Sequence, residues 1–127
     1  MTITICGSIK FYNDFLTLGK ELERQGHKIL QPQEPIINSE SSGFLKDEGM
    51  VRRHMDKIAI SDAVLIANYP KNNIEGYIGP NTLMEMAVAF HLKKKIYLLN
   101  PVPDQAWKEE VLSLSPIILT NDLGKIR

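Results

Sequence analysis

The chain has 127 residues, of which 43% are hydrophobic and 24% are charged, a composition typical of a globular protein with one core. Fifteen basic residues balance fifteen acidic ones, so net charge gives no reason to expect nucleic acid or a membrane surface as a partner. We therefore expect one domain over residues 1–127, with no nucleic-acid and no membrane partner.

Cysteine content and the start of the chain predict a cellular compartment. The one cysteine, Cys6, excludes an intramolecular disulfide, and no Cys/His spacing typical of zinc accompanies it. We expect Cys6 to be a small buried hydrophobe, the alternative being a reactive thiol near a site, and we expect no metal and no cofactor. The chain starts directly with a strand pattern, and no apolar run approaches the roughly 20 residues that cross a bilayer. These features predict a cytoplasmic protein.

The hydrophobic period switches repeatedly between that of a strand and that of a helix. Phe11, Phe15, Leu18 and Leu22 recur at helical spacing, and Gly26 then ends the helix. In chain order the pattern predicts a strand over 3–6, a helix over 11–25, a strand over 27–32, a loop over 32–45, a helix over 46–60, a strand over 63–68, a helix over 79–90, a strand over 96–100, a short helix over 104–112 and a strand over 116–119.

The predicted loop over residues 32–45 is longer than most connections in a compact domain. It contains prolines, serines, an asparagine and a glycine, and loops of this length are usually functional or mobile. Phe44 and Leu45 lie inside it. We interpret these two residues as an apolar lid.

The alternation of strands and helices predicts an α/β fold. We expect a doubly wound, flavodoxin- or Rossmann-like three-layer sandwich with a five-stranded parallel sheet. Ligands of such sheets bind beyond the carboxyl ends of the strands. Gly7 and Ser8 follow a predicted strand, and Asn68 and Asn100 each end one, so all four are candidate binding residues. Asp62 precedes the third strand, so we expect it at the opposite edge.

Glu85 is the one ionisable group in the apolar segment over residues 76–90, GYIGPNTLMEMAVAF. Gly79, Pro80 and Asn81 mark the start of its helix, and the N–H groups and dipole of a helix start favour a negative charge. A carboxylate is rarely buried without a partner, so Glu85 needs either a cation or a chemical role. The alternative is a glutamate paired with a surface Lys or Arg.

The turn over residues 7–10, Gly-Ser-Ile-Lys, is a candidate phosphate site. It offers backbone N–H groups, the Ser8 hydroxyl and the Lys10 ammonium. It is neither the glycine fingerprint of dinucleotide-binding folds nor a P-loop, so we do not expect NAD binding or NTP hydrolysis. The alternative is an ordinary turn with an exposed lysine.

Four motifs together resemble one enzyme family. They are the CGSI turn over residues 6–9, SDAVLIA over 61–67, the pattern GxxxxxEMAxA over 79–89, and KxIYLLN over 94–100. This combination, which covers most of the chain, resembles the nucleoside 2-deoxyribosyltransferase superfamily. The CGSIK opening is most similar to the 2'-deoxynucleoside 5'-phosphate N-hydrolases.

The resemblance implies a doubly wound fold and a glutamate that attacks C1' of the sugar to form a glycosyl-enzyme ester. Glu85 matches that nucleophile, and Asp62 matches an aspartate that serves the leaving base. Gly7, Ser8 and Lys10 match the turn near the sugar and the 5' group.

The sequence departs from the family pattern at two places. The family's tyrosine on strand one has no counterpart, which leaves Tyr12, Tyr69 or Tyr77 as substitutes. Gly79 stands where relatives often have a serine or aspartate that binds the 5' end, and Asn81 is the nearest polar replacement.

The chemistry of N-glycoside cleavage agrees with these assignments. It needs a carboxylate at the sugar ring and a donor for the leaving base. Glu85 suits the first task, and Asp62 when protonated, His54 or a tyrosine suits the second, although each histidine by itself is more typical of a structural or surface residue. We predict cleavage of a small nucleoside or its 5'-monophosphate, with a hydrolase favoured over a transferase. The alternative is a non-catalytic nucleotide-binding module on the same fold.

Apolar residues on nearly every face of the helix over 79–90 predict a homodimer or larger homo-oligomer. The helix over 46–60 adds a mixed apolar and basic surface suited to the same contact. The alternative cover for these residues is the loop over 32–45.

Overall fold

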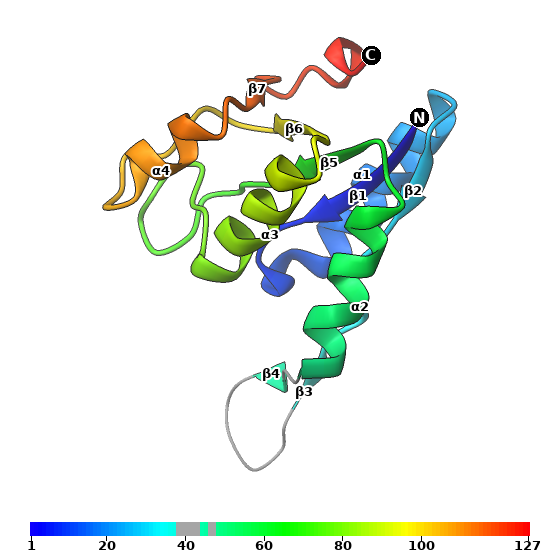
Figure 1. Cartoon of the computed structure of the whole chain (residues 1–127), viewed down its shortest axis with the longest axis horizontal. Coiled ribbons are helices and arrows are strands. Elements are labelled where there is room, and N and C mark those ends of the chain that lie inside the picture. Colours follow the sequence, from blue (N-terminus) through cyan, green and yellow to red (C-terminus); the bar gives the residue numbers. More distant parts are fainter. Residues whose placement is uncertain (38–43, 46–47) are drawn as a thin grey trace.

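Five parallel strands form the central sheet (Figure 1). The computed structural model describes the backbone of residues 1–37, 44–45 and 48–127, and it describes side chains outside residues 36–47. In chain order the strands of this sheet are β1 (Thr2–Cys6), β2 (Lys28–Leu30), β5 (Ala63–Ile66), β6 (Lys95–Leu98) and β7 (Ile117–Ile118). Their order across the sheet is β2-β1-β5-β6-β7, with every pairing parallel. The predicted α/β fold with a five-stranded parallel sheet is confirmed.

Helices cover both faces of this sheet (Figure 1). α1 (Tyr12–Arg24) packs on one face, and α2 (Glu48–Ala59), α3 (Pro80–His91) and α4 (Lys108–Ser113) pack on the other. Two 3-10 turns, η1 (Ile9–Phe11) and η2 (Leu123–Lys125), complete the helical elements of the described residues. None of the helices in the described part of the chain has the length and apolarity needed to cross a membrane.

Side chains of the central strands alternate between the two faces, as the period of a strand requires. Ile3 and Ile5 of β1 belong to the core cluster that contains Phe15 of α1. Cys6 belongs to the opposite cluster, with Met86 of α3. Each residue of β5 is fully buried, because a central parallel strand is covered on both sides. This alternation directs Cys6 toward the helices that carry the candidate site.

The direction of winding reverses at β1. The chain passes from β1 outward to β2, then returns across β1 to β5 and continues to β6 and β7. The carboxyl ends of β1 and β5 therefore mark the switch in strand order, where doubly wound sheets bind their ligands.

The turn after β1 requires a glycine. A side-chain carbon at Gly7 would lie 2.9 Å from the ring of Phe15 and 3.0 Å from the carbonyl oxygen of Ala67. Contacts this short would force the α1 ring or the backbone after β5 to move. Gly7 therefore allows the turn after β1 to pack closely against α1 and the end of β5, which places Ser8 at the site.

The predicted loop over residues 32–45 contains a small antiparallel pair of strands, β3 (Ile36–Ile37) and β4 (Phe44–Leu45). Strands of two residues are too short to produce an alternating pattern, so the sequence gives no signal for them. The predicted lid formed by the side chains of Phe44 and Leu45 falls outside the described side chains.

Candidate active site

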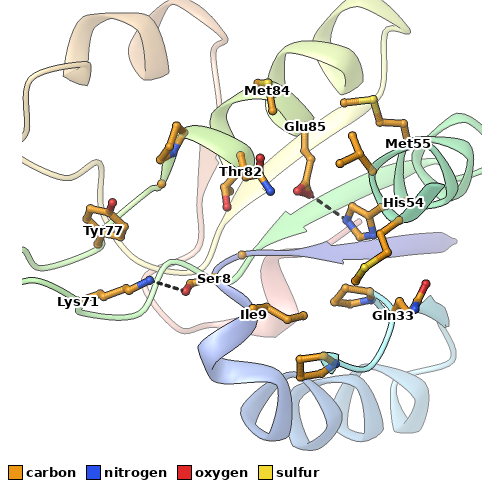
Figure 2. Close-up of a pocket in the computed structure, with 18 residues that line it drawn as sticks. Ser8, Ile9, Gln33, His54, Met55, Lys71, Tyr77, Thr82, Met84 and Glu85 are labelled. Atoms are coloured by element: carbon orange, nitrogen blue, oxygen red, sulfur yellow. Dashed lines mark hydrogen bonds and ion pairs between the residues drawn. The ribbon is translucent and has the colours of Figure 1, made fainter. Parts of the chain in front are cut away.

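A cavity of about 500 Å³ opens beyond the carboxyl ends of β1 and β5 (Figure 2). Its walls come from the turn after β1, the segment after β2, α2, the loop after β5 and the start of α3. This volume lies in the usual range for small-molecule sites, about 300–1,000 Å³. The predicted site residues that line it are Gly7, Ser8, Gly79, Asn81 and Glu85.

Glu85 contacts His54 of α2 at the cavity wall (Figure 2). Glu85 Oε2 and His54 Nε2 are 2.9 Å apart, and their side chains are only 15% and 11% exposed. Cys6 completes the cluster, with its Sγ atom 3.4 Å from His54 Nε2. Burial raises the pKa of the Cys6 thiol, and the charge of the Glu85 carboxylate raises it further. The thiol is therefore protonated at neutral pH.

Two buried atoms of this cluster have no aligned hydrogen-bond partner among the described residues, namely Glu85 Oε2 and His54 Nδ1. The Glu85 carboxylate and the His54 ring are thus in close contact, but the angle between them is not that of a well-directed hydrogen bond. An unpaired buried polar group costs about 1–3 kcal/mol, and native structures contain few of them. Gln31 Oε1 and Gln105 Nε2 are also buried without a partner among the described residues, but of these four residues only Glu85 and His54 line the cavity, where a ligand can reach them.

α2 is anchored where it brings His54 to the cavity. The hydroxyl of Ser61, just after the helix, lies 2.6 Å from Thr4 Oγ1 on β1 and donates to the carbonyl oxygen of Lys57 at 2.7 Å. The Lys57 ammonium donates to the carbonyl oxygen of Gln31 after β2, also at 2.7 Å. These bonds fix α2 against the sheet, so the position of His54 is set by the fold.

α3 begins at the cavity wall. Its N-cap is Gly79, which has no side chain for capping, and Pro80 has no N–H group. Asn81 and Thr82 therefore carry the first N–H groups that the helix offers, and both residues line the cavity. Glu85 is the sixth residue of α3 and lies one turn beyond the strongest part of the dipole field.

Lys71 places a positive charge at the other end of the cavity (Figure 2). Its Nζ atom donates to Ser8 Oγ at 2.9 Å and lies 5.7 Å from the centre of the Tyr77 ring. Lys71 starts a tight turn in which Asn72 and Asn73 have left-handed backbone, with φ of 53° and 59°. Asparagine tolerates this conformation better than most residues. The turn therefore fixes the point from which Lys71 reaches the cavity.

Gln33 lines the cavity near α2 (Figure 2). Arg53 donates two hydrogen bonds to the Gln33 side-chain oxygen, at 3.1 and 2.7 Å. The amide NH₂ of Gln33 is therefore the group left to serve a ligand. Pro32 and Met55 give this part of the wall an apolar surface.

Asn68 and Asn100 have structural positions. The Asn68 side-chain oxygen accepts from the backbone N–H of Asn100 at 2.8 Å, and its NH₂ group donates to carbonyl oxygens of Gly76, Asn100 and Pro101 at 3.0–3.3 Å. The Asn100 NH₂ group donates to the Asn68 carbonyl at 3.1 Å. Neither residue is among those that line the cavity. Their hydrogen bonds hold the loops after β5 and β6 together, so we do not propose a substrate contact for either residue.

Asp62 and Lys10 also lie away from the cavity. Asp62 is exposed at the amino end of β5, where its carboxylate accepts from the backbone N–H of Thr2 at 2.8 Å. This is the edge opposite Glu85, because parallel strands end together, so we do not propose that Asp62 serves the leaving base. Lys10 is exposed and lies 5.8 Å from the Phe11 ring. Lys71 takes the position in the site that the sequence suggested for Lys10.

Three site residues were missed or undervalued at the sequence level. His54 was weighed for the leaving base but judged more typical of a structural residue, and Lys71 and Tyr77 received no binding role. A signal for Lys71 was present, because it is a cation in the loop after the third predicted strand. Tyr77 lines the cavity, unlike the other two tyrosines considered as substitutes, Tyr12 and Tyr69.

Comparison with known proteins identifies the fold. No protein-family profile and no curated protein sequence matches the chain. A CMP N-glycosidase from Clostridium botulinum superposes with a TM-score of 0.56 at 15% identity, over 93% of this chain and 85% of that one. A 2-deoxyribosyltransferase from Leishmania mexicana gives 0.55 at 18% identity, over 80% and 67% of the two chains. A 2-deoxyribosyltransferase from Bacillus psychrosaccharolyticus gives 0.51 at 19% identity, over 77% and 71%. The chain therefore shares its fold with these N-glycosidase and 2-deoxyribosyltransferase structures.

Proposed function

We propose that the protein cleaves the N-glycosidic bond of a nucleoside 5'-monophosphate, with Glu85 as the nucleophile and water as the final acceptor. The observation that carries the proposal is the largely buried Glu85 carboxylate on the wall of a cavity of nucleotide size. The fold shared with a CMP N-glycosidase and with 2-deoxyribosyltransferases supports this class of reaction.

The phosphate of the substrate is assigned to the end of the cavity formed by Lys71, Ser8 and the start of α3. An ammonium, a hydroxyl and the free N–H groups of a helix start are the donors that phosphate oxygens accept from most readily. Tyr77, beside Lys71, adds a ring and a hydroxyl to this end. The need to neutralise Lys71 favours a monophosphate over an uncharged nucleoside.

The sugar is assigned to the middle of the cavity, where C1' meets Glu85. Attack by the carboxylate forms a C1'–O bond as the C1'–N bond breaks, and the base leaves with the bonding electrons and gains a proton. Water then attacks the ester carbon C1', releases the sugar phosphate and regenerates Glu85. His54 Nε2, 2.9 Å from the carboxylate, is close enough to C1' to act as a base for this water.

The base is assigned to the end near α2. Pro32 and Met55 offer apolar contacts to the faces of a flat ring, and the Gln33 amide NH₂ has no partner among the residues that the structure describes. A hydrogen bond from this NH₂ group to an acceptor on the base would stabilise the negative charge that develops as the bond breaks.

The direct test is to incubate the protein with nucleosides and their 5'-monophosphates, in ribose and deoxyribose forms, and to follow free base by chromatography. We expect release from at least one monophosphate and a loss of release in Glu85→Gln. Addition of a second base distinguishes the transferase, which would form a new nucleotide. Tight binding of a monophosphate by the wild-type protein without any base release would instead support a nucleotide-sensing module.

We also propose that the protein works as a homodimer or larger homo-oligomer through α2 and α3. Met84 and Phe90 of α3 are 48% and 51% exposed, and large exposed apolar side chains on one helix are typical of an interface. Sedimentation at micromolar concentration tests this proposal. A monomer of 14.4 kDa would contradict it.

A further inference from the structure

Cys6, His54 and Glu85 form a side-chain cluster whose chemistry extends beyond glycoside cleavage. The three residues are far apart in the sequence, but the fold brings one potential ligand atom of each within 4.8 Å of the other two. A thiol, an imidazole and a carboxylate are the three types of ligand found in protein zinc sites. The spacing of Cys and His residues along the chain does not predict such a site, because the three ligands come from the end of β1, from α2 and from α3.

We propose that Cys6 Sγ, His54 Nε2 and Glu85 Oε2 bind one Zn²⁺ ion, and that this ion and a sugar bound to Glu85 exclude each other. The second half of this proposal rests on the proposed function, whereas the first half does not. Zinc fits because it accepts sulfur, nitrogen and oxygen ligands together in one tetrahedral site.

Two of the three separations between ligand atoms can be compared with those of a tetrahedral zinc site. Bonds of zinc to these ligands would separate neighbouring ligand atoms by about 3.4–3.6 Å in a tetrahedron. The separation of Cys6 Sγ and His54 Nε2 is 3.4 Å, and that of His54 Nε2 and Glu85 Oε2 is 2.9 Å. A small rotation of the Glu85 side chain would open the second distance. The fourth position would face the cavity, which His54 and Glu85 line, and would hold water or an anion.

Unsatisfied electrostatics favour a cation at this point. Glu85 Oε2 lies 2.9 Å from His54 Nε2 but has no aligned donor among the described residues, and a metal ion bound by both atoms would supply a positive partner. Binding would also convert the Cys6 thiol to a thiolate, because a coordinated thiol loses its proton. The double charge of zinc is then balanced by one thiolate and one carboxylate, so the occupied cluster is neutral and well suited to burial.

The same cluster predicts moderate affinity. Histidines that bind metals usually donate a hydrogen bond from their other ring nitrogen, and loss of such a partner lowers affinity by about 10–100-fold. His54 Nδ1 has no such partner among the described residues. The ion should therefore exchange readily with a chelator, as a reversible inhibitor would.

Cobalt titration of the metal-free protein tests the site without reference to activity. Co²⁺ bound by a thiolate gives a sulfur-to-metal absorption band in the near ultraviolet, and Cys6 is the only cysteine of the chain. We expect this band to saturate at one ion per chain and to disappear on addition of Zn²⁺. Absence of the band in the folded wild-type protein would overturn the proposal, whatever the outcome of any activity assay.

Variants identify the other two ligands. His54→Gln and Glu85→Gln should each weaken cobalt binding by at least about tenfold. His91→Gln, at the exposed end of α3, is the matched control and should bind as the wild type does. A sulfur band of unchanged affinity in either ligand variant would contradict the three-ligand site. Circular dichroism of each variant verifies that it is folded. If a variant does not fold, the cobalt band of the wild-type protein still tests the site.

Affinity should increase with pH. A cysteine binds zinc as a thiolate, so each ion that binds must displace one proton from the Cys6 thiol. The dissociation constant should therefore fall about tenfold for each unit of pH increase until the thiol itself ionises. Proton release measured by calorimetry in two buffers checks this value. An affinity independent of pH would exclude Cys6 as a ligand.

Mutual exclusion is tested last, with a substrate that the wild-type protein cleaves. Zn²⁺ should inhibit base release in proportion to occupancy of the cobalt-binding site, and a chelator should restore it. Full activity with the site saturated would show that zinc and the sugar do not exclude each other. It would not contradict the metal site itself. If no substrate is cleaved, the proposed function fails, and the cobalt titration still decides whether the site exists.

Discussion

Two polar clusters lie near the carboxyl edge of the sheet, and they differ in how completely their hydrogen bonds are satisfied. In the cluster of Asn68 and Asn100, the Asn68 oxygen and NH₂ group both have partners, and Asn121 donates to the Asn100 oxygen at 2.7 Å. In the cluster of Glu85 and His54, a carboxylate oxygen and a ring nitrogen are buried without aligned partners in the part of the chain that the structure describes. The first cluster does not line the cavity and the second does.

The difference separates residues that stabilise the fold from residues available for chemistry. A fully bonded network makes the structure more rigid, and its members have no capacity left for a ligand. A partly satisfied cluster costs stability, and it is retained where a substrate or an ion completes it. Changes in the two clusters should therefore affect different measured quantities, and this contrast can be tested.

The largest expected effect is on catalysis, from Glu85→Gln. This variant keeps the shape of the side chain and removes the attacking charge, so base release should fall by at least about 10³-fold. The free energy of unfolding should stay the same or increase, because a buried charge without an aligned donor is lost. Single-turnover assays and urea denaturation measure the two quantities. Strong destabilisation of this variant would show that Glu85 mainly stabilises the fold, as Asn68 and Asn100 do.

The next largest effect is on stability, from Asn68→Ala. It leaves the Asn100 N–H and several carbonyl oxygens without their partner, which should lower the free energy of unfolding by about 2–4 kcal/mol. Below the unfolding transition, affinity for the substrate should change little. Denaturation curves with ligand titration check both statements. A stable variant that no longer binds substrate would show that Asn68 contacts the substrate.

A smaller effect, on kcat/KM, should distinguish Lys71 from Lys10, the two lysines considered for the phosphate. Lys71→Ala removes the cation at Ser8, so kcat/KM for a monophosphate should fall by about 10–100-fold, with little change for the matching nucleoside. Lys10→Ala is the matched control, because Lys10 is exposed and does not line the cavity. It should change both substrates by less than about twofold. Equal losses for nucleotide and nucleoside in Lys71→Ala would exclude a phosphate contact.

The sequence predicted the fold well because periodicity is a local property. The apolar run before Asn68 and the helical spacing from Phe11 to Leu22 need no knowledge of distant contacts. Glu85 was found for the same reason, as a charge in an apolar helix. The pairing of Glu85 with His54 depends on how α2 is anchored to β1, which no local pattern encodes. For Asn68, a position at the end of a strand does not reveal whether the side chain contacts backbone or ligand, and the structure shows it bonded to backbone.

The smallest expected effect concerns Asp62, where the sequence resemblance and the structure disagree. The resemblance implies a role for Asp62 with the leaving base, whereas the structure bonds its exposed carboxylate to the N–H of Thr2 at the opposite edge of the sheet. Asp62→Ala should therefore lower the free energy of unfolding by less than about 1 kcal/mol and leave base release within about twofold of wild type. Steady-state kinetics and urea denaturation measure these values. A loss of base release by 10²-fold or more, in the range of general acid–base catalysis, would mean that Asp62 reaches the substrate. Because Asp62 does not line the cavity and lies at the opposite edge of the sheet from Glu85, that result would indicate that a second chain brings its own Asp62 to the cavity.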